Sequence, residues 1–130
     1  MIPQRIKETC LYVSDLQRTE DFYRGKLGLP VISRVEGRHI FFRAGASVLL
    51  CFIAEKTLAE TELPPHGARG AIHFAFEVAR AAYDAAVQET GSAGIRITHH
   101  HTWPNGLRSF YFDDPDGHVV EVIEEGLWER

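Results

Sequence analysis

Cysteine, long apolar runs and excess positive charge are all scarce in this chain of 130 residues. The two cysteines, Cys10 and Cys51, are too few for a disulfide framework. We expect both cysteines to be small, buried, hydrophobic side chains in a reducing, cytoplasmic setting. The sequence leaves open whether a disulfide bond joins them. The longest apolar run, residues 48–54, is too short to span a bilayer, and residues 1–7 lack the apolar run of a signal peptide. The net charge is −4 and no basic stripe is present, so nucleic acid and anionic membrane are not expected partners.

The sequence has the composition of a soluble globular protein, with 45% hydrophobic and 25% charged residues. Its length predicts a single domain spanning residues 1–130. Within it a β–α–β–β–β pattern occurs twice, in a first module over residues 1–54 and a second over residues 71–130. A polar linker, residues 55–70, joins them. The predicted fold class is α+β, with two βαβββ modules forming a curved mixed sheet around a cavity.

Periodicity and turn residues set the expected elements. Ser14 and Gln17 form a capping-box pattern, and Gly28 ends the helix that begins there. The expected strands are 6–13, 31–35, 39–43 and 48–53 in the first half, and 71–78, 95–101, 107–112 and 118–123 in the second. The expected helices are 14–27, a short one at 58–62 in the linker, and 80–90.

Three polar residues occupy inward positions in this pattern. Glu8 and His73 lie on the first strand of each half, each opposite the apolar row of its own strand. Glu121 lies within an apolar strand, where a carboxylate needs a partner or a metal ion. In the first half, Leu50 takes the place that matches Glu121. We therefore predict that Glu8, His73 and Glu121 are ligands of one metal ion.

Two carboxylates and one imidazole suit a divalent ion such as Zn, Mn, Fe, Ni or Co. Three protein ligands leave coordination positions for water and substrate, which is typical of a reactive site. Taken singly, each residue has a more ordinary interpretation, since a lone strand histidine is usually a hydrogen-bonded core residue and a glutamate near a strand start is usually exposed.

Further side chains are candidates for substrate contacts. In the run 99–101, alternation places the first and third histidines on one face, and exposed or cavity-rim histidines are favoured over a second metal site. An arginine after the turn 103–106 can hold an anionic group, or can be a solvated residue at a strand end. The substrate-binding candidates are Tyr12, His39, His99, His101, Arg108 and Tyr111.

Three segments resemble one known family. They are Leu11–Leu16 with Phe22–Tyr23 and Leu27–Leu29, then Gly70–Phe76, then Asp114–Glu121. In this order and spacing they resemble the vicinal oxygen chelate superfamily, which includes glyoxalase I, bleomycin-resistance proteins, fosfomycin-resistance transferases and extradiol dioxygenases. The resemblance covers essentially the whole chain.

The resemblance implies paired βαβββ modules, commonly a homodimer, and one metal ion at Glu8, His73 and Glu121. Substrate oxygens would chelate that ion, and Glu121 or Glu8 would be the general base of a proton abstraction. Two positions depart from the family pattern. Glu8 stands where dioxygenases and many transferases have histidine, and Leu50 stands where glyoxalase I has a fourth ligand.

The function expected from these features is that of a divalent-metal-dependent enzyme acting on a small oxygen-rich substrate. Lyase, isomerase and dioxygenase chemistry all stay open, because one scaffold serves all of them. The alternative is a metal-free, bleomycin-resistance-type protein that binds and sequesters a small molecule. A third interpretation is an interaction module whose dimer surface is its function.

Overall fold

The computed structural model describes residues 1–129, which form two compact units, Met1–Gly70 and a second that begins at Ala71. The elements of the first unit are β1 (Glu8–Tyr12), α1 (Leu16–Glu20), the π-helical η1 (Asp21–Lys26), β2 (Val31–Val35), β3 (His39–Ala44), β4 (Ser47–Phe52) and α2 (Ala54–Leu58). Those of the second are β5 (His73–Val78), the 3₁₀ turn η2 (Arg80–Ala82), α3 (Tyr83–Ser92), β6 (His99–Thr102), β7 (Arg108–Asp113) and β8 (Val119–Glu124).

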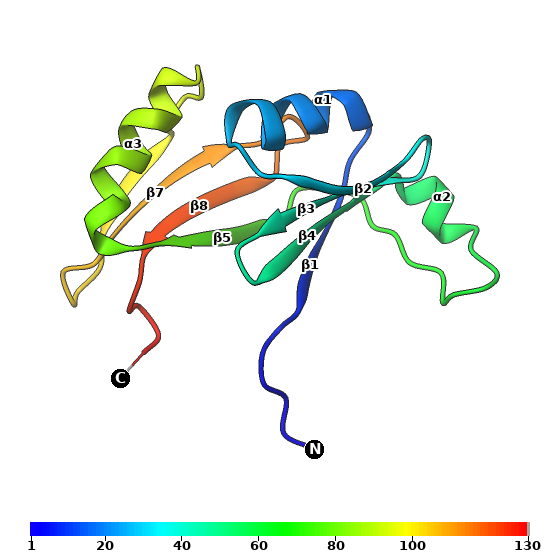
Figure 1. Cartoon of the computed structure of the whole chain (residues 1–130), viewed down its shortest axis with the longest axis horizontal. Helices are drawn as coiled ribbons and strands as arrows, with labels where there is room; N and C mark the ends of the chain where they lie inside the picture. The colour runs from blue at the N-terminus through cyan, green and yellow to red at the C-terminus, as the bar shows by residue number, and fades with distance from the viewer. Residues whose placement is uncertain (130) are drawn as a thin grey trace. The chain divides into compact units, whose positions relative to one another are not determined.

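Both units have the same topology (Figure 1). The strand order is β1-β4-β3-β2 in the first four-stranded sheet and β5-β8-β7-β6 in the second. The first strand of each unit pairs in parallel with the last, and the other pairs are antiparallel. The predicted α+β fold with a repeated β–α–β–β–β pattern is therefore confirmed.

Each sheet buries one apolar face under its own helix (Figure 1). In the first unit Phe42 and Tyr23 are fully buried, with ring centroids 5.5 Å apart. In the second, Tyr83 of α3 meets Phe110 of β7 at 5.6 Å. Burying a large apolar side chain stabilises a fold by roughly 1.5–3 kcal/mol. These helix-facing rows supply the cores. The opposite face carries Glu121 and Tyr111 in the second sheet, but Phe41 and Leu50 in the first.

The start of α1 differs from the capping-box prediction. Asp15, not Ser14, is the N-cap, and its carboxylate accepts a hydrogen bond from the Arg18 backbone N–H at 3.0 Å. Asp15 has extended backbone angles (φ −147°, ψ 110°), which hold its side chain over the first turn. Gln17 does not complete a capping box, because its amide donates to Asp21 at 2.9 Å.

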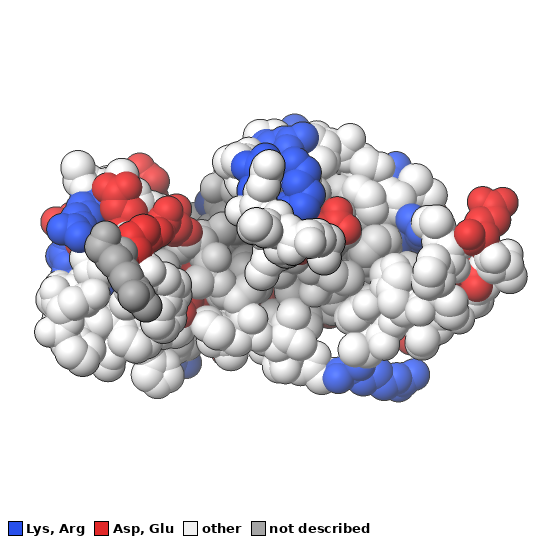
Figure 2. Space-filling view, turned by 90° about the horizontal axis from the view of Figure 1, so that it is seen from below, with Lys and Arg blue, Asp and Glu red and all other residues white. Residues whose placement is uncertain are grey.

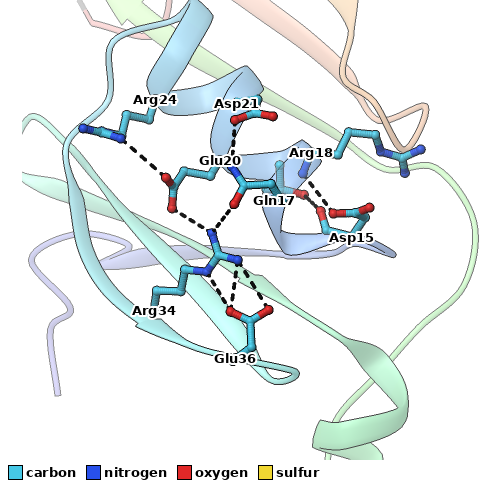
Figure 3. A network of polar contacts seen from close by, with 9 residues as sticks. Asp15, Gln17, Arg18, Glu20, Asp21, Arg24, Arg34 and Glu36 are labelled. Atoms are coloured by element: carbon cyan, nitrogen blue, oxygen red, sulfur yellow. Dashed lines mark hydrogen bonds and ion pairs between the residues drawn. The ribbon is translucent and has the colours of Figure 1, made fainter.

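Arg34 of β2 ties the helix to its sheet (Figure 3). Its guanidinium donates to Gln17 at 3.1 Å and Glu20 at 3.0 Å, both on α1. It also donates to Glu36 just beyond β2 at 3.0 Å. One cation therefore joins the helix to the edge strand of the first sheet.

The linker begins with α2, directly after β4. The prediction of a helix at 58–62 was wrong in position, because the helix ends at Leu58. Beyond it the chain turns, with the Glu60 N–H donating to the Thr57 carbonyl at 3.3 Å. The Glu60 carboxylate is held by Arg38 at 2.7 Å, which draws this segment toward the sheet instead of along a helix.

Basic and acidic side chains on the face drawn in Figure 2 form small separate groups within largely uncharged surface. No helix among residues 1–129 is long and apolar enough to cross a membrane. Neither cysteine is bonded to another cysteine in the structure.

Candidate functional site

The strand register places the candidate ligands at equivalent points of the two sheets. Ala75, two residues after His73, pairs with Glu121. Cys10, two residues after Glu8, pairs with Leu50 in the same way. Leu50 is therefore the counterpart of Glu121, and the first sheet has an alkyl group where the second has a carboxylate.

His73 and Glu121 lie together on the second sheet, with 3.2 Å between Nε2 and Oε2. The other ring nitrogen of His73, Nδ1, lies 3.0 Å from the carbonyl oxygen of Val119. A carbonyl only accepts, so Nδ1 carries the proton of this bond. A neutral His73 then presents the Nε2 lone pair to the Glu121 carboxylate, and a proton or a metal ion is needed between these two acceptors.

The Glu121 carboxylate is nearly buried, with 8% of its side chain exposed. Its second oxygen, Oε1, is buried and has no hydrogen-bond partner among residues 1–129. The neighbouring side chains Val120 and Val122 are buried in the apolar core. Removing a carboxylate from water without compensation is costly, so this oxygen is suited to a cation.

A row of polar and aromatic side chains continues from Glu121 across the sheet. Glu121 pairs with Tyr111 of β7, which pairs with His99 of β6. The pKa of Tyr111 is raised, mainly by burial and also by the neighbouring Glu121 carboxylate, against an opposing hydrogen bond from Ser109. Tyr111 is therefore a protonated donor at neutral pH. His99 and His101 lie on the same face as Tyr111 and are exposed, as alternation predicts.

Arg108 lies on the opposite face of β7, toward α3. Its guanidinium donates to Glu124 at 2.6 Å and to Asp84 at 2.9 Å, and it stacks over the Tyr83 ring at 4.3 Å. Hydrogen bonds from Arg108 are the main cause that lowers the pKa of Glu124. Arg108 therefore does not share a face with Glu121, because residues of odd and even number point to opposite sides of this strand.

On the first sheet, Glu8, Cys10 and Tyr12 alternate along β1 on the face away from α1. Glu8 is exposed. The pKa of the Cys10 thiol is raised, mainly by burial, so Cys10 is not a ready thiolate ligand. Burial, together with a hydrogen bond to Cys10, raises the pKa of Tyr12 to about 12. Tyr12 shares a hydrogen bond of 2.8 Å with Nδ1 of His66 in the linker.

His39 is only 6% exposed, and both of its ring nitrogens are engaged. Nδ1 accepts from the Arg38 guanidinium, so Nε2 carries the proton and donates to Ser33 Oγ at 2.9 Å. Burial is the main cause that lowers the pKa of His39, and the Arg38 cation adds to it. The ring also stacks on Phe41 at 3.9 Å. His39 therefore has no free nitrogen for a substrate.

The prediction from sequence overlooked Ser109 and Trp103. Ser109 is fully buried, and its hydroxyl accepts from Trp103 Nε1 at 3.1 Å. Ser109 could have been found from alternation, since it has the same phase as Tyr111 on β7. The contact with Trp103 crosses a turn and has no sequence signal.

Among residues 1–129, no group of three or more histidine, cysteine, aspartate or glutamate side chains is gathered as a metal site. Within the second unit, His73 and Glu121 supply two adjacent donor atoms. Both donors have the chemistry of a ligand set, with a supported imidazole and a buried carboxylate.

Most of the chain is matched by the model of a known family. Residues 5–122 match the Glyoxalase/Bleomycin resistance protein/Dioxygenase superfamily. The match covers most of the chain, which belongs to this superfamily.

Individual proteins that are similar to this chain have names more specific than that of the superfamily. The chain is 30% identical over 127 residues to glutathione transferase FosA of Serratia marcescens, covering 92% of this chain and 79% of that protein. It is 38% identical to a lactoylglutathione lyase from Agrobacterium tumefaciens, with a TM-score of 0.92 and 98% of both chains covered. A superfamily protein from Nocardioides is 25% identical, with a TM-score of 0.76 and coverage of 97% of this chain and 87% of that one.

Proposed function

We propose that this protein is a divalent-metal-dependent enzyme in which His73, Glu121 and Glu8 hold one ion. The observation that carries the proposal is the pair of facing acceptors, His73 Nε2 and Glu121 Oε2, beside a buried carboxylate oxygen without a partner. A cation bound at this pair would compensate the charge and lone pairs of all three atoms. Glu8, exposed on β1, is the third ligand in this proposal.

The spacing of the pair fits a shared ion. Two ligand atoms that each lie about 2.1 Å from one metal are roughly 3.0 Å apart in octahedral geometry and roughly 3.4 Å apart in tetrahedral geometry. The 3.2 Å between Nε2 and Oε2 lies within this range. The carbonyl of Val119 holds the imidazole by its other nitrogen, which is the usual support of a metal-binding histidine.

A second candidate function has the same observation behind it. If a proton lies on Nε2, His73 and Glu121 form an imidazolium–carboxylate ion pair, and no metal is required. The protein would then be a metal-free binder of a small molecule, as bleomycin-resistance proteins are. The buried Glu121 oxygen without a partner favours the metal, because a proton on His73 leaves that oxygen unsatisfied.

Metal content separates the two functions. Protein purified without chelator should contain one divalent ion per chain by elemental analysis, and Glu121→Gln or His73→Gln should abolish it. Glu77→Gln is the matched control, since Glu77 is exposed on β5 in phase with His73. Wild-type protein that stays metal-free when Zn, Mn, Fe, Ni and Co are supplied would remove the metal-dependent function and leave the binder.

The substrate is proposed to be small and oxygen-rich, with two oxygens chelating the ion. Both a lyase and a transferase among the relatives have glutathione in their names. We therefore propose a glutathione-linked substrate as the first to be assayed. Metal-loaded protein should be tested for lactoylglutathione lyase activity and for glutathione transfer, with Glu121→Gln as the inactive reference. The metal would polarise the chelated oxygens and stabilise negative charge on them.

The residues proposed to contact substrate follow from their positions. His99, His101 and Tyr111 share the face of Glu121, and Tyr12 lies on the corresponding face of the first sheet. Arg108 is left out, because Glu124 and Asp84 already pair its guanidinium. A homodimer and a cytoplasmic location complete the proposal.

A further inference from the structure

A pocket of about 300 Å³ lies on the second unit, where α3 meets the strands β6 and β7. The side chains that line it include Tyr83, Asp84 and Val87 of α3, His100 and Thr102 of β6, and Arg108 of β7. Thr102 pairs with Arg108, and His100 lies two residues earlier in the same phase, so these three side chains share the face of the sheet opposite Glu121. The pocket is therefore separate from the pair of His73 and Glu121, and an inference about it does not rest on the proposed metal ion.

Arg108 presents unused hydrogen-bond donors at this pocket. A guanidinium has five N–H donors. Among residues 1–129, Glu124 accepts from Nε and Nη2 of Arg108, and Asp84 accepts from Nη1. One N–H on each terminal nitrogen is left for a ligand, in a side chain that is 40% exposed. The Tyr83 ring lies against one face of the guanidinium, 4.3 Å from its central carbon, and helps to hold the group in place.

The two carboxylates that pair with Arg108 differ in how firmly they are bound. The Glu124 side chain is 7% exposed, so water competes little for its place. The Asp84 side chain is 86% exposed, and an ion pair in such a position is weak, because water solvates both charges. Asp84 is therefore a replaceable partner of Arg108, whereas Glu124 keeps the guanidinium fixed.

The lining side chains indicate which ligand suits the pocket. Arg108 offers a planar fork of donors that matches a carboxylate, and the exposed Thr102 hydroxyl can add one donor. Asp84 is the only carboxylate among the lining residues, and Val87 supplies an apolar wall. A volume of 300 Å³ equals that of roughly ten water molecules, which exceeds the size of an inorganic anion. The pocket therefore suits an organic acid better than a bare ion.

We propose that this pocket binds a small organic acid, whose carboxylate takes the place of Asp84 on Arg108 and whose apolar part packs against Val87. Thr102 and His100 then donate hydrogen bonds to the polar groups of the ligand. Asp84 is an internal competitor, since its carboxylate must leave Arg108 before the ligand can bind and its charge repels the ligand. Removal of the Asp84 charge should therefore strengthen binding, whereas loss of an ordinary lining residue weakens it.

The first experiment titrates the ¹⁵N-labelled full chain with benzoate and follows the signals of Arg108 Nε–H and the Thr102 amide. Both signals should shift and saturate in the wild type. Asp84→Asn should bind benzoate about two- to fivefold more tightly, which corresponds to the contribution of an exposed ion pair. Glu89→Gln is the matched control, because it removes an equal charge from an exposed position of α3 outside the pocket, and it should bind like the wild type.

The second experiment tests the donors. Thr102→Val, at an exposed position, should weaken benzoate binding about threefold. Arg108→Gln should weaken it about tenfold or more. Because Arg108→Gln leaves Glu124 buried without its cation, thermal unfolding must show that this variant is folded, and Thr102→Val keeps the test decisive if it is not.

Three results would overturn the proposal. The first is the absence of a saturable shift at Arg108 and Thr102 in both the wild type and Asp84→Asn. The second is binding by Asp84→Asn that is equal to or weaker than that of the wild type. The third is inorganic phosphate that binds as tightly as benzoate, which would refute an organic acid as the ligand. Benzoate bound instead to a metal ion at Glu121 would shift signals on the other face of the sheet and would not respond to Asp84→Asn.

Discussion

The ion pair between Arg108 and Glu124 allows a direct test of whether Arg108 stabilises the second sheet. Glu124 is buried, with 7% of its side chain exposed, and accepts from the Arg108 backbone N–H at 2.8 Å, from Nε at 3.0 Å and from Nη2 at 2.6 Å. The proposed change is Glu124→Gln, which keeps the shape and one acceptor but removes the charge.

The expected loss of stability follows from these contacts. A hydrogen bond to a charged group contributes about 1.5–3 kcal/mol and a neutral one about 0.5–1.5 kcal/mol. Glutamine at position 124 keeps some of the hydrogen bonds from Arg108. The Arg108 side chain is 40% exposed, so water screens its charge and can rehydrate it. We therefore expect the free energy of unfolding at pH 7 to fall by about 1–2 kcal/mol. Asp84→Asn is the matched control, because the Asp84 side chain is 86% exposed and its contribution should stay below about 0.5 kcal/mol.

The pH dependence gives a second check. Arg108 lowers the pKa of Glu124 below its ordinary value of 4.5 in the folded protein. The stability that the charged Glu124 contributes is therefore complete above the pKa of Glu124 in the unfolded chain, and it is lost as the pH falls through the pKa in the folded protein. Urea unfolding should show a difference between wild type and Glu124→Gln at pH 7 that shrinks as the pH is lowered below 4.5. If the difference in stability between wild type and Glu124→Gln is the same at pH 7 and below pH 4.5, packing and not charge is responsible for the lost stability.

Two further predictions concern the first unit. Asp15→Ala should lower the free energy of unfolding by about 1 kcal/mol through loss of the α1 cap, measured by urea unfolding, whereas Ser14→Ala should have a much smaller effect. Equal losses in both variants would refute the assignment of the cap. Tyr12→Phe removes the hydrogen bond to His66, so residues 59–70 should exchange amide hydrogens faster, and unchanged exchange there would show that this bond does not hold the linker.

Much of the fold could be read from the sequence because local rules agree with the tertiary structure. Alternation along residues 73–78 separated Phe74 and Phe76 from His73, and the structure keeps that separation. Glycines and prolines marked the turns between strands. Where an element differs from the prediction, neighbouring residues compete for the same structural role. Asp15 took the cap from Ser14, and the linker helix ended at Leu58 instead of beginning there.

The candidate site, like the fold, could be predicted only in part from the sequence. The sequence by itself determined that a carboxylate lies at position 121 of an apolar strand, and that His73 and Leu50 occupy defined places in a repeated pattern. Only the tertiary structure decided that Arg108 turns toward Glu124, and that Trp103 reaches Tyr111 through Ser109. The physical reason is that alternation along a strand fixes which face a side chain takes, whereas partners from other strands and turns decide what it binds.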